Sequence, residues 1–183
     1  MYHRIRNLLH KVCHSQYQGF VLLALGLLVM SGPVSAKQTL LVMGDSLSAA
    51  YNLPSEQGWV ALAAKRMKAT HPQWSVVNAS VSGETTSGGL SRMPAALKQH
   101  KPKLVIIELG SNDALRGLPL ELSRRNLQSM IRMAKAADAK VLLIGMQMPP
   151  NYGKAYTEGF AGNYKALAKQ EKTALLPFLL QPI

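Results

Sequence analysis

The chain has 183 residues, of which 48% are hydrophobic, and a formal net charge of +12 at pH 7. Its one cysteine, Cys13, excludes a disulfide framework. The basic residues are scattered along the chain rather than clustered, so we expect no nucleic-acid partner in spite of the charge. The part that follows the N-terminal leader has the usual size of one domain.

The N-terminal 36 residues are typical of an export signal. Three basic residues precede an apolar run over residues 20–30, and the small residues Val34-Ser35-Ala36 follow it. The run is 11 residues long, whereas a membrane-spanning helix needs about 20. We therefore expect a signal peptide over residues 1–36 that is cleaved near Ala36, no stable membrane anchor, and a periplasmic or secreted protein.

Short apolar runs alternate with amphipathic stretches along residues 37–183, which is the pattern of parallel strands joined by helices. The middle runs are apolar at nearly every position, as expected of strands that are buried on both faces. The predicted strands cover residues 39–43, 75–79, 104–109, 141–146 and 174–178.

Between these runs, apolar residues recur at helical spacing. The spacing predicts helices over residues 59–67, 120–134 and 156–167. A further helix is expected over residues 89–99, where Pro94 would be tolerated only near the first turn. The predicted fold class is α/β: a three-layer α/β/α sandwich around a parallel, flavodoxin-like sheet, formed by residues 37–183 as one domain.

Polar loops follow the first three predicted strands, at the edge where such sheets bind ligands. Ser46 follows the first strand and a glycine, ahead of a segment expected to turn into a helix, so its hydroxyl would lie beside the free N–H groups of a helix N-terminus. That placement suits a nucleophile, and it suits a helix N-cap equally well. The residue two positions after Ser46 is Ser48, which excludes the Gly-x-Ser-x-Gly elbow of α/β-hydrolases.

Gly83 and Asn112 follow the second and third predicted strands. The Gly83 N–H could face a developing oxyanion, because a glycine lets the backbone approach closely, or Gly83 could be a plain turn residue. The Asn112 amide has two donor hydrogens and no charge, which suits an oxyanion, and the alternative is an Asx-turn.

Together these positions resemble the GDSL, or SGNH, family of lipases and esterases. The matching blocks are 44–47 (Gly-Asp-Ser-Leu), Gly83 and 110–113 (Gly-Ser-Asn-Asp). Three further segments are similar to the bacterial periplasmic thioesterase I, lysophospholipase and arylesterase branch of that family, namely residues 77–85, 97–102 and 149–153.

The resemblance implies a serine esterase or thioesterase that uses neither a metal nor a cofactor. Ser46 would attack an acyl ester or thioester, such as an acyl-CoA, a lysophospholipid or an aryl ester, and an acyl-enzyme would form. The oxyanion would be held by the backbone N–H groups of Ser46 and Gly83 and by the Asn112 side chain. Asp113 is expected to bond loop N–H groups, and the protein is expected to be a monomer.

Five residues in the loops that follow the later strands are candidates for binding the acyl chain. They could line an apolar groove, or they could pack within the loops. These residues are Leu115, Leu118, Met148, Pro149 and Tyr152.

The chain departs from the family at its fourth block, an Asp-x-x-His near the C-terminus that supplies the general base and its orienting carboxylate. Residues 37–183 contain two histidines, His71 and His100, and each precedes a predicted strand, at the opposite edge of the sheet from Ser46. We therefore expect no catalytic histidine in this chain, a C-terminal truncation that also removes a closing helix, and turnover near background. The alternatives to a hydrolase are a catalytically inactive or lipid-binding homologue and an unstable fragment.

Overall fold

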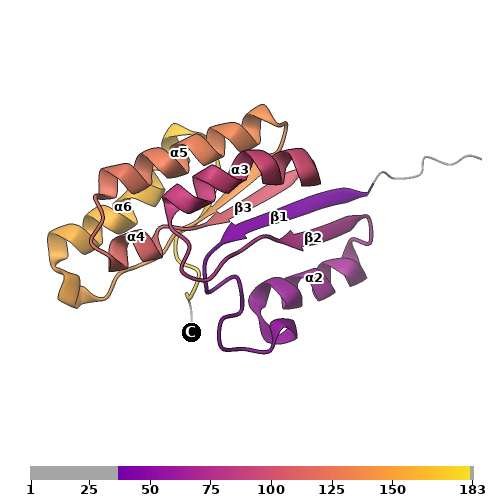
Figure 1. Cartoon of the computed structure of the whole chain (residues 1–183), viewed down its shortest axis with the longest axis horizontal. Coiled ribbons are helices and arrows are strands. Elements are labelled where there is room, and N and C mark those ends of the chain that lie inside the picture. Colours follow the sequence, from indigo (N-terminus) through magenta and orange to yellow (C-terminus); the bar gives the residue numbers. More distant parts are fainter. Residues whose placement is uncertain (1–36, 182–183) are drawn as a thin grey trace, which may run out of the picture. The chain divides into compact units, whose positions relative to one another are not determined.

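The computed structural model describes residues 37–181, and the predicted export signal lies outside them. Five strands form one sheet: β1 (Gln38–Gly44), β2 (Trp74–Asn78), β3 (Leu104–Glu108), β4 (Lys140–Ile144) and β5 (Ala174–Leu176). All are parallel, and their order across the sheet is β2-β1-β3-β4-β5 (Figure 1). This is the flavodoxin-like order, so the predicted fold class is confirmed.

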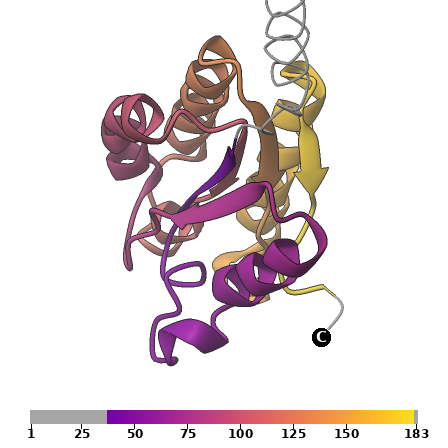
Figure 2. The same ribbon diagram turned by 90° about the vertical axis from the view of Figure 1, so that its right-hand side faces the viewer.

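Helices cover both faces of the sheet. They are α2 (Trp59–Thr70), α3 (Thr86–His100), α4 (Ser111–Leu115), α5 (Leu120–Ala136) and α6 (Lys154–Gln170), with short 3₁₀ segments η1 (Ser55–Gln57) and η2 (Pro150–Tyr152). Figures 1 and 2 show α3, α5 and α6 on one face and α2 on the other. The helices predicted over residues 59–67, 89–99, 120–134 and 156–167 are present, and α4 is a short addition that the apolar spacing did not predict.

The two faces of the sheet can be read from β1. Leu41 and Met43 are fully buried in the core formed with α3, α5 and α6, whereas Leu40 and Val42 belong to the smaller core on the α2 side. They alternate because successive residues of a strand point to opposite faces. Since β1 lies between β2 and β3, its C-terminal loop emerges in the interior of the carboxyl edge rather than at the rim.

Pro94 differs from its predicted placement. It lies in the middle of α3, not near the first turn, and the helix continues through it to His100. Its side chain is exposed, so water can replace the backbone hydrogen bond that proline cannot donate. Thr85 caps the helix by accepting a 3.3 Å hydrogen bond from the Gly88 N–H, which starts α3 three residues earlier than the sequence predicted.

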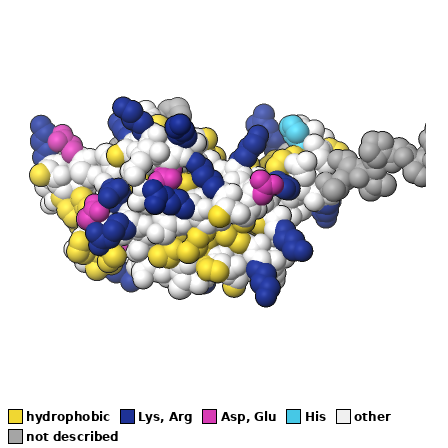
Figure 3. All heavy atoms as spheres, turned by 90° about the horizontal axis from the view of Figure 1, so that it is seen from above, with side chains coloured by type: hydrophobic (Ala, Val, Ile, Leu, Met, Phe, Trp, Pro, Cys, Tyr) yellow, Lys and Arg dark blue, Asp and Glu magenta, His cyan; other side chains and the backbone are white. Residues whose placement is uncertain are grey.

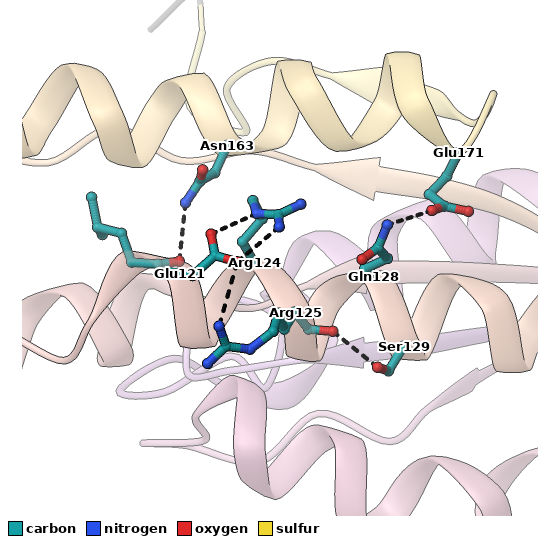
Figure 4. Close-up of polar contacts among 8 residues, drawn as sticks. Glu121, Arg124, Arg125, Gln128, Ser129, Asn163 and Glu171 are labelled. Atoms are coloured by element: carbon teal, nitrogen blue, oxygen red, sulfur yellow. Dashed lines mark hydrogen bonds and ion pairs between the residues drawn. The ribbon is translucent and has the colours of Figure 1, made fainter.

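Polar contacts hold α6 against α5 (Figure 4). Gln128 Nε2 of α5 donates a 2.7 Å hydrogen bond to Glu171 Oε1, just after α6. Near the other end of the seam, Asn163 Nδ2 of α6 donates to the Leu120 carbonyl oxygen at 3.1 Å. These bonds fix the position of α6, and with it the loop between β4 and α6.

Basic side chains are spread over the surface. On the face seen in Figure 3, lysines and arginines are separated by apolar and uncharged residues and by a few acidic ones. Several arginines are paired, as Arg124 is with Glu121 at 2.8 Å. Within residues 37–181, no helix has the length and the apolar character needed to cross a bilayer.

Candidate active site

The candidate residues lie in the loops at the carboxyl edge of the sheet. Ser46 follows β1, Gly83 follows β2, and Asn112 is the second residue of α4, which follows β3. Register pairs Gly44 with Glu108, so β1 and β3 end side by side. The chain crosses from one side of β1 to the other at this point, which is where ligands bind in such sheets.

Ser46 lies in a turn, and the predicted helix N-terminus at this position is wrong. The Ala49 N–H donates to the Asp45 carbonyl oxygen at 2.9 Å, but α2 begins only at Trp59. Ala50 and Asn52 adopt left-handed φ angles of 58° and 61°, which a right-handed helix cannot accommodate. Within the described residues, the Ser46 N–H has no acceptor, so the turn leaves it available.

Gly83 occupies a turn with a left-handed φ of 78°. A Cβ atom there would meet only Arg116 Nη2, at 3.8 Å, so the glycine serves the backbone angle rather than a need for space. The Gly83 carbonyl oxygen accepts from Arg116 Nη2 at 2.9 Å. Its own N–H has no acceptor in residues 37–181, which gives the site a second available backbone donor.

The Asn112 side chain connects two loops. Its Nδ2 atom donates to the Glu84 carbonyl oxygen at 3.0 Å and to Asp45 Oδ2 at 3.3 Å. The bonds therefore reach the loops after β1 and β2 and do not close a turn around Asn112 itself. Because both amide hydrogens have an acceptor in this structure, an oxyanion would have to take one of them over, and the longer bond to Asp45 is the weaker.

A pocket with a volume of about 260 Å³ opens beside Ser46 and Asn112. Of the five predicted acyl-chain residues, Leu115, Met148 and Pro149 line it. The pocket is also lined by residues that were not predicted from the sequence, namely Asp45, Leu47, Ser111, Met146, Gln147 and Leu180.

Gly83, Leu118 and Tyr152 are not in the pocket lining. Leu118 is half-buried, and its carbonyl oxygen accepts from the Tyr156 hydroxyl at 3.2 Å. Tyr152 ends η2 with 37% of its surface exposed. The structure thus brings three of the five predicted acyl-chain residues together and leaves two outside this cavity.

Two buried carboxyl groups lie beneath the Ser46 loop. Asp45 is 1% exposed and Glu108 is fully buried. Burial, and then the charge of Asp45, raises the pKa of Glu108 to about 8, and burial also raises the pKa of Asp45. Neither residue was predicted to have a role in the site. The available signal for Glu108 was an acidic residue within the apolar run over residues 104–109.

Asp113 anchors α4 to α3. It accepts from the Thr86 N–H at 2.8 Å, from Thr86 Oγ1 at 2.5 Å and from Ser123 Oγ at 3.1 Å. Its side chain is 1% exposed. Asp113 thus accepts from a backbone N–H, but this N–H belongs to the first residue of α3 rather than to a loop as expected. The bonds fix the residue that follows Asn112.

Neither histidine of the described region lies at the edge that carries Ser46. His71 caps the end of α2 and precedes β2, and its Nδ1 lies 2.8 Å from Thr70 Oγ1. His100 ends α3 and precedes β3. The seven residues of β1, at ~3.3 Å each, put roughly 20 Å between the two edges.

A doubly wound parallel sheet with a serine and an asparagine amide in one pocket at its switch point defines the class of serine hydrolases with an α/β/α sandwich. Comparison with family models is more specific. Residues 42–182 match the model of the GDSL-like Lipase/Acylhydrolase family, and the chain belongs to that family.

Relatives of known name agree with this assignment. The chain is 54% identical to "Esterase TesA" of Pseudomonas aeruginosa over 156 residues, which cover 85% of this chain and 78% of the relative. It is 42% identical to "Thioesterase 1/protease 1/lysophospholipase L1" of Escherichia coli K12 over 157 residues, which cover 86% of this chain and 74% of the relative. A crystal structure of TesA superposes with a TM-score of 0.77 at 56% identity, covering 79% of this chain and 80% of that one.

Proposed function

We propose that the chain hydrolyses acyl esters or thioesters through an acyl-enzyme formed on Ser46. The observation that carries the proposal is the single pocket that contains Ser46, Asn112 and an apolar wall of Leu115, Met148 and Pro149. A pocket of this kind fits a carbonyl group at its polar end and an acyl chain along its wall. The esterase and thioesterase names of the relatives favour hydrolysis over a lipid-binding homologue.

Three donors would hold the oxyanion: the N–H groups of Ser46 and Gly83 and the Asn112 amide. Both backbone donors lack an acceptor within residues 37–181. As the carbonyl becomes tetrahedral, its charged oxygen is a stronger acceptor than Asp45 at 3.3 Å, so Asn112 Nδ2 transfers one hydrogen bond to it. Removal of one such donor typically slows turnover by about 10²-fold to 10³-fold.

Ser46 has no histidine within reach to serve as its general base among the described residues, because His71 and His100 lie at the other edge. A polypeptide of residues 37–183 should therefore turn over slowly, by about 10⁴-fold to 10⁶-fold relative to an enzyme with a complete triad. The substrate-binding and oxyanion-binding parts of the site are independent of that base, so a base supplied in solution should accelerate the reaction.

We further propose that the protein is exported, with residues 1–36 as its signal, and acts as a monomer on a small-molecule acyl ester or thioester. The basic start, the short apolar run and the small residues before Ala36 support export. An acyl-CoA, a lysophospholipid and an aryl ester all present the carbonyl group and the apolar part that the pocket fits.

Imidazole rescue tests the proposed function. Residues 37–183 are incubated with p-nitrophenyl butyrate and increasing imidazole, and the reaction of imidazole alone is subtracted. The protein-dependent rate should rise with imidazole and should be lost in Ser46→Ala. It should persist in Ser111→Ala, the matched control, because Ser111 lines the same pocket but its hydroxyl oxygen is buried and has no hydrogen-bond partner in the described region. Equal rates for Ser46→Ala and the unmodified chain would reject the proposal.

A further inference from the structure

Asp45 and Glu108 form a buried pair at the junction of β1 and β3. The two residues come from loops and strands 63 positions apart in the sequence, and the Gly44–Glu108 register sets them side by side. Neither side chain has more than 1% of its surface exposed. Two carboxyl groups so placed cannot both carry a charge without a large electrostatic cost.

The contacts of Glu108 support the turn that carries Ser46. Its Oε2 atom accepts from Ser48 Oγ at 2.7 Å and, more weakly, from the Asp45 N–H at 3.4 Å. A Cβ atom at position 44 would lie 2.6 Å from Ser48 Oγ and 2.9 Å from Glu108 Oε2. The strand must therefore end in glycine for these groups to meet.

Asp45 connects the pair to the Ser46 turn and to the Asn112 side chain. Its Oδ1 atom accepts from the Leu47 N–H at 3.0 Å, directly after Ser46. Its Oδ2 atom accepts from Asn112 Nδ2 at 3.3 Å. A change in the charge of Asp45 therefore changes the strength of its hydrogen bonds to the Ser46 turn and to the Asn112 amide.

The surroundings supply no compensating cation. The other ionisable groups near the pair are Asp113 of α4, whose charge raises the pKa of Asp45, and Tyr164 of α6, whose pKa is raised by burial and by the charge of Glu108, so neither supplies a positive charge. No lysine, arginine or histidine of residues 37–181 forms an ion pair with Asp45 or Glu108. A proton is the remaining means of relieving the repulsion.

Glu108 is the member of the pair that holds the proton. Its Oε1 atom is buried and has no partner in the described region, so protonation turns an unsatisfied acceptor into a donor. Burial, and then the charge of Asp45, raises the pKa of Glu108 from 4.5 to about 8. A hydrogen bond donated by Glu108 to Asp45 would act in the same direction on Glu108 and would lower the pKa of Asp45. At neutral pH, Glu108 is therefore the acid and Asp45 the carboxylate.

We propose that Glu108 is a positioning residue of the site: its carboxylic acid donates to Asp45, and the resulting proton-sharing pair holds the Ser46 turn and the Asn112 amide in place. The assignment of a role in the site rests on the proposed function, whereas the shared proton does not. When pH rises through the pKa of Glu108, the pair gains a second charge and the Asn112 amide moves.

Glu108→Gln tests the inference without removing the hydrogen bonds. The glutamine amide donates to Asp45 and its oxygen accepts from Ser48, but the group does not titrate. Glu158→Gln is the control, because Glu158 is an exposed carboxylate of α6. The infrared spectrum at pH 7 should contain a buried carboxylic-acid carbonyl band that is present in the control and absent from Glu108→Gln.

NMR of the Asn112 side-chain NH₂ group, assigned with Asn112→Ala, tests the positioning itself. Its signals should shift between about pH 7 and pH 9 in the unmodified chain and in the control, and should stay constant in Glu108→Gln. An absent acid band, or Asn112 signals that do not move with pH or that move equally in Glu108→Gln, would overturn the inference. Neither reading involves turnover, so a failure of ester hydrolysis and a failure of this inference are distinguished.

Discussion

The hydroxyl of Tyr164, in α6, donates a 2.9 Å hydrogen bond to the carbonyl oxygen of Leu109, the residue that follows β3. Next to it, Gly110 has a φ of 119°, and a Cβ atom there would collide with the Tyr164 hydroxyl. Tyr164 is 1% exposed and packs edge-on against Phe160, with the ring centroids 5.3 Å apart. The turn that leads into α4 is thus shaped by a side chain from a helix more than 50 residues away.

Tyr164→Phe should lower the free energy of unfolding by about 1–3 kcal/mol, because it leaves the buried Leu109 carbonyl oxygen without its donor. Tyr156→Phe is the matched control, since the Tyr156 hydroxyl donates to the Ala114 and Leu118 carbonyl oxygens at 3.2–3.3 Å from a half-buried position. Urea unfolding of both variants measures the difference. A loss for Tyr164→Phe no larger than that of the control would contradict this role of the hydroxyl.

Asp113→Ala should be among the most destabilising substitutions at this edge. It leaves the Thr86 N–H, Thr86 Oγ1 and Ser123 Oγ without their acceptor, at about 1–3 kcal/mol for each buried group that finds no substitute. Glu158→Ala removes an exposed carboxylate 3.8 Å from Lys154 and should change stability by less than about 1 kcal/mol. Denaturant midpoints at fixed pH compare the two, and similar midpoints would refute the anchoring role of Asp113.

Gly83→Ala should destabilise the protein by about 1–2 kcal/mol through the backbone alone, because an alanine disfavours a φ of 78°. Gly162→Ala gives the opposite sign as a control. Gly162 is exposed within α6 and has open space around it, so alanine should stabilise the helix by up to about 1 kcal/mol. Thermal unfolding distinguishes the two, and a stabilised Gly83→Ala would mean that the left-handed turn is not required.

Asn112→Ala should lower kcat of the imidazole-supported reaction by about 10²-fold to 10³-fold with little change in KM. The reason is that the amide meets the oxyanion only once the carbonyl has become tetrahedral. Leu115→Ala is the control, since Leu115 lines the pocket with 52% of its surface exposed and should mainly raise KM. A raised KM with unchanged kcat for Asn112→Ala would assign the amide to substrate binding instead.

The strands and helices were predictable because their signals are local. The run at residues 104–109 is apolar at most positions, which indicates a strand buried on both faces wherever it lies in the sheet. The α3 start was missed because it depends on one capping bond from Gly88 to Thr85. The turn after Ser46 was also missed. Its left-handed positions are occupied by Ala50 and Asn52 rather than by glycine, the residue that usually indicates such a turn.

The candidate site was predictable only in part. Ser46, Gly83 and Asn112 each come after a strand. Because the strands of a parallel sheet all end at the same edge, the sequence predicted that the three residues lie at one edge. The Asp45–Glu108 pair did not follow, because it requires β1 and β3 to be neighbours, and that adjacency is a property of the strand order rather than of either segment. For the same reason Leu180, which comes after β5, was not recognised as part of the pocket wall.

Mapping a covalent phosphonate adduct tests the central claim most directly. Residues 37–183 are incubated for a long period with an alkyl fluorophosphonate, digested, and sequenced by mass spectrometry. The adduct should lie on Ser46, which lines the pocket, and Ser46→Ala should prevent it. An adduct on Ser48 or Ser111, or equal labelling of the Ser46→Ala variant, would contradict the account.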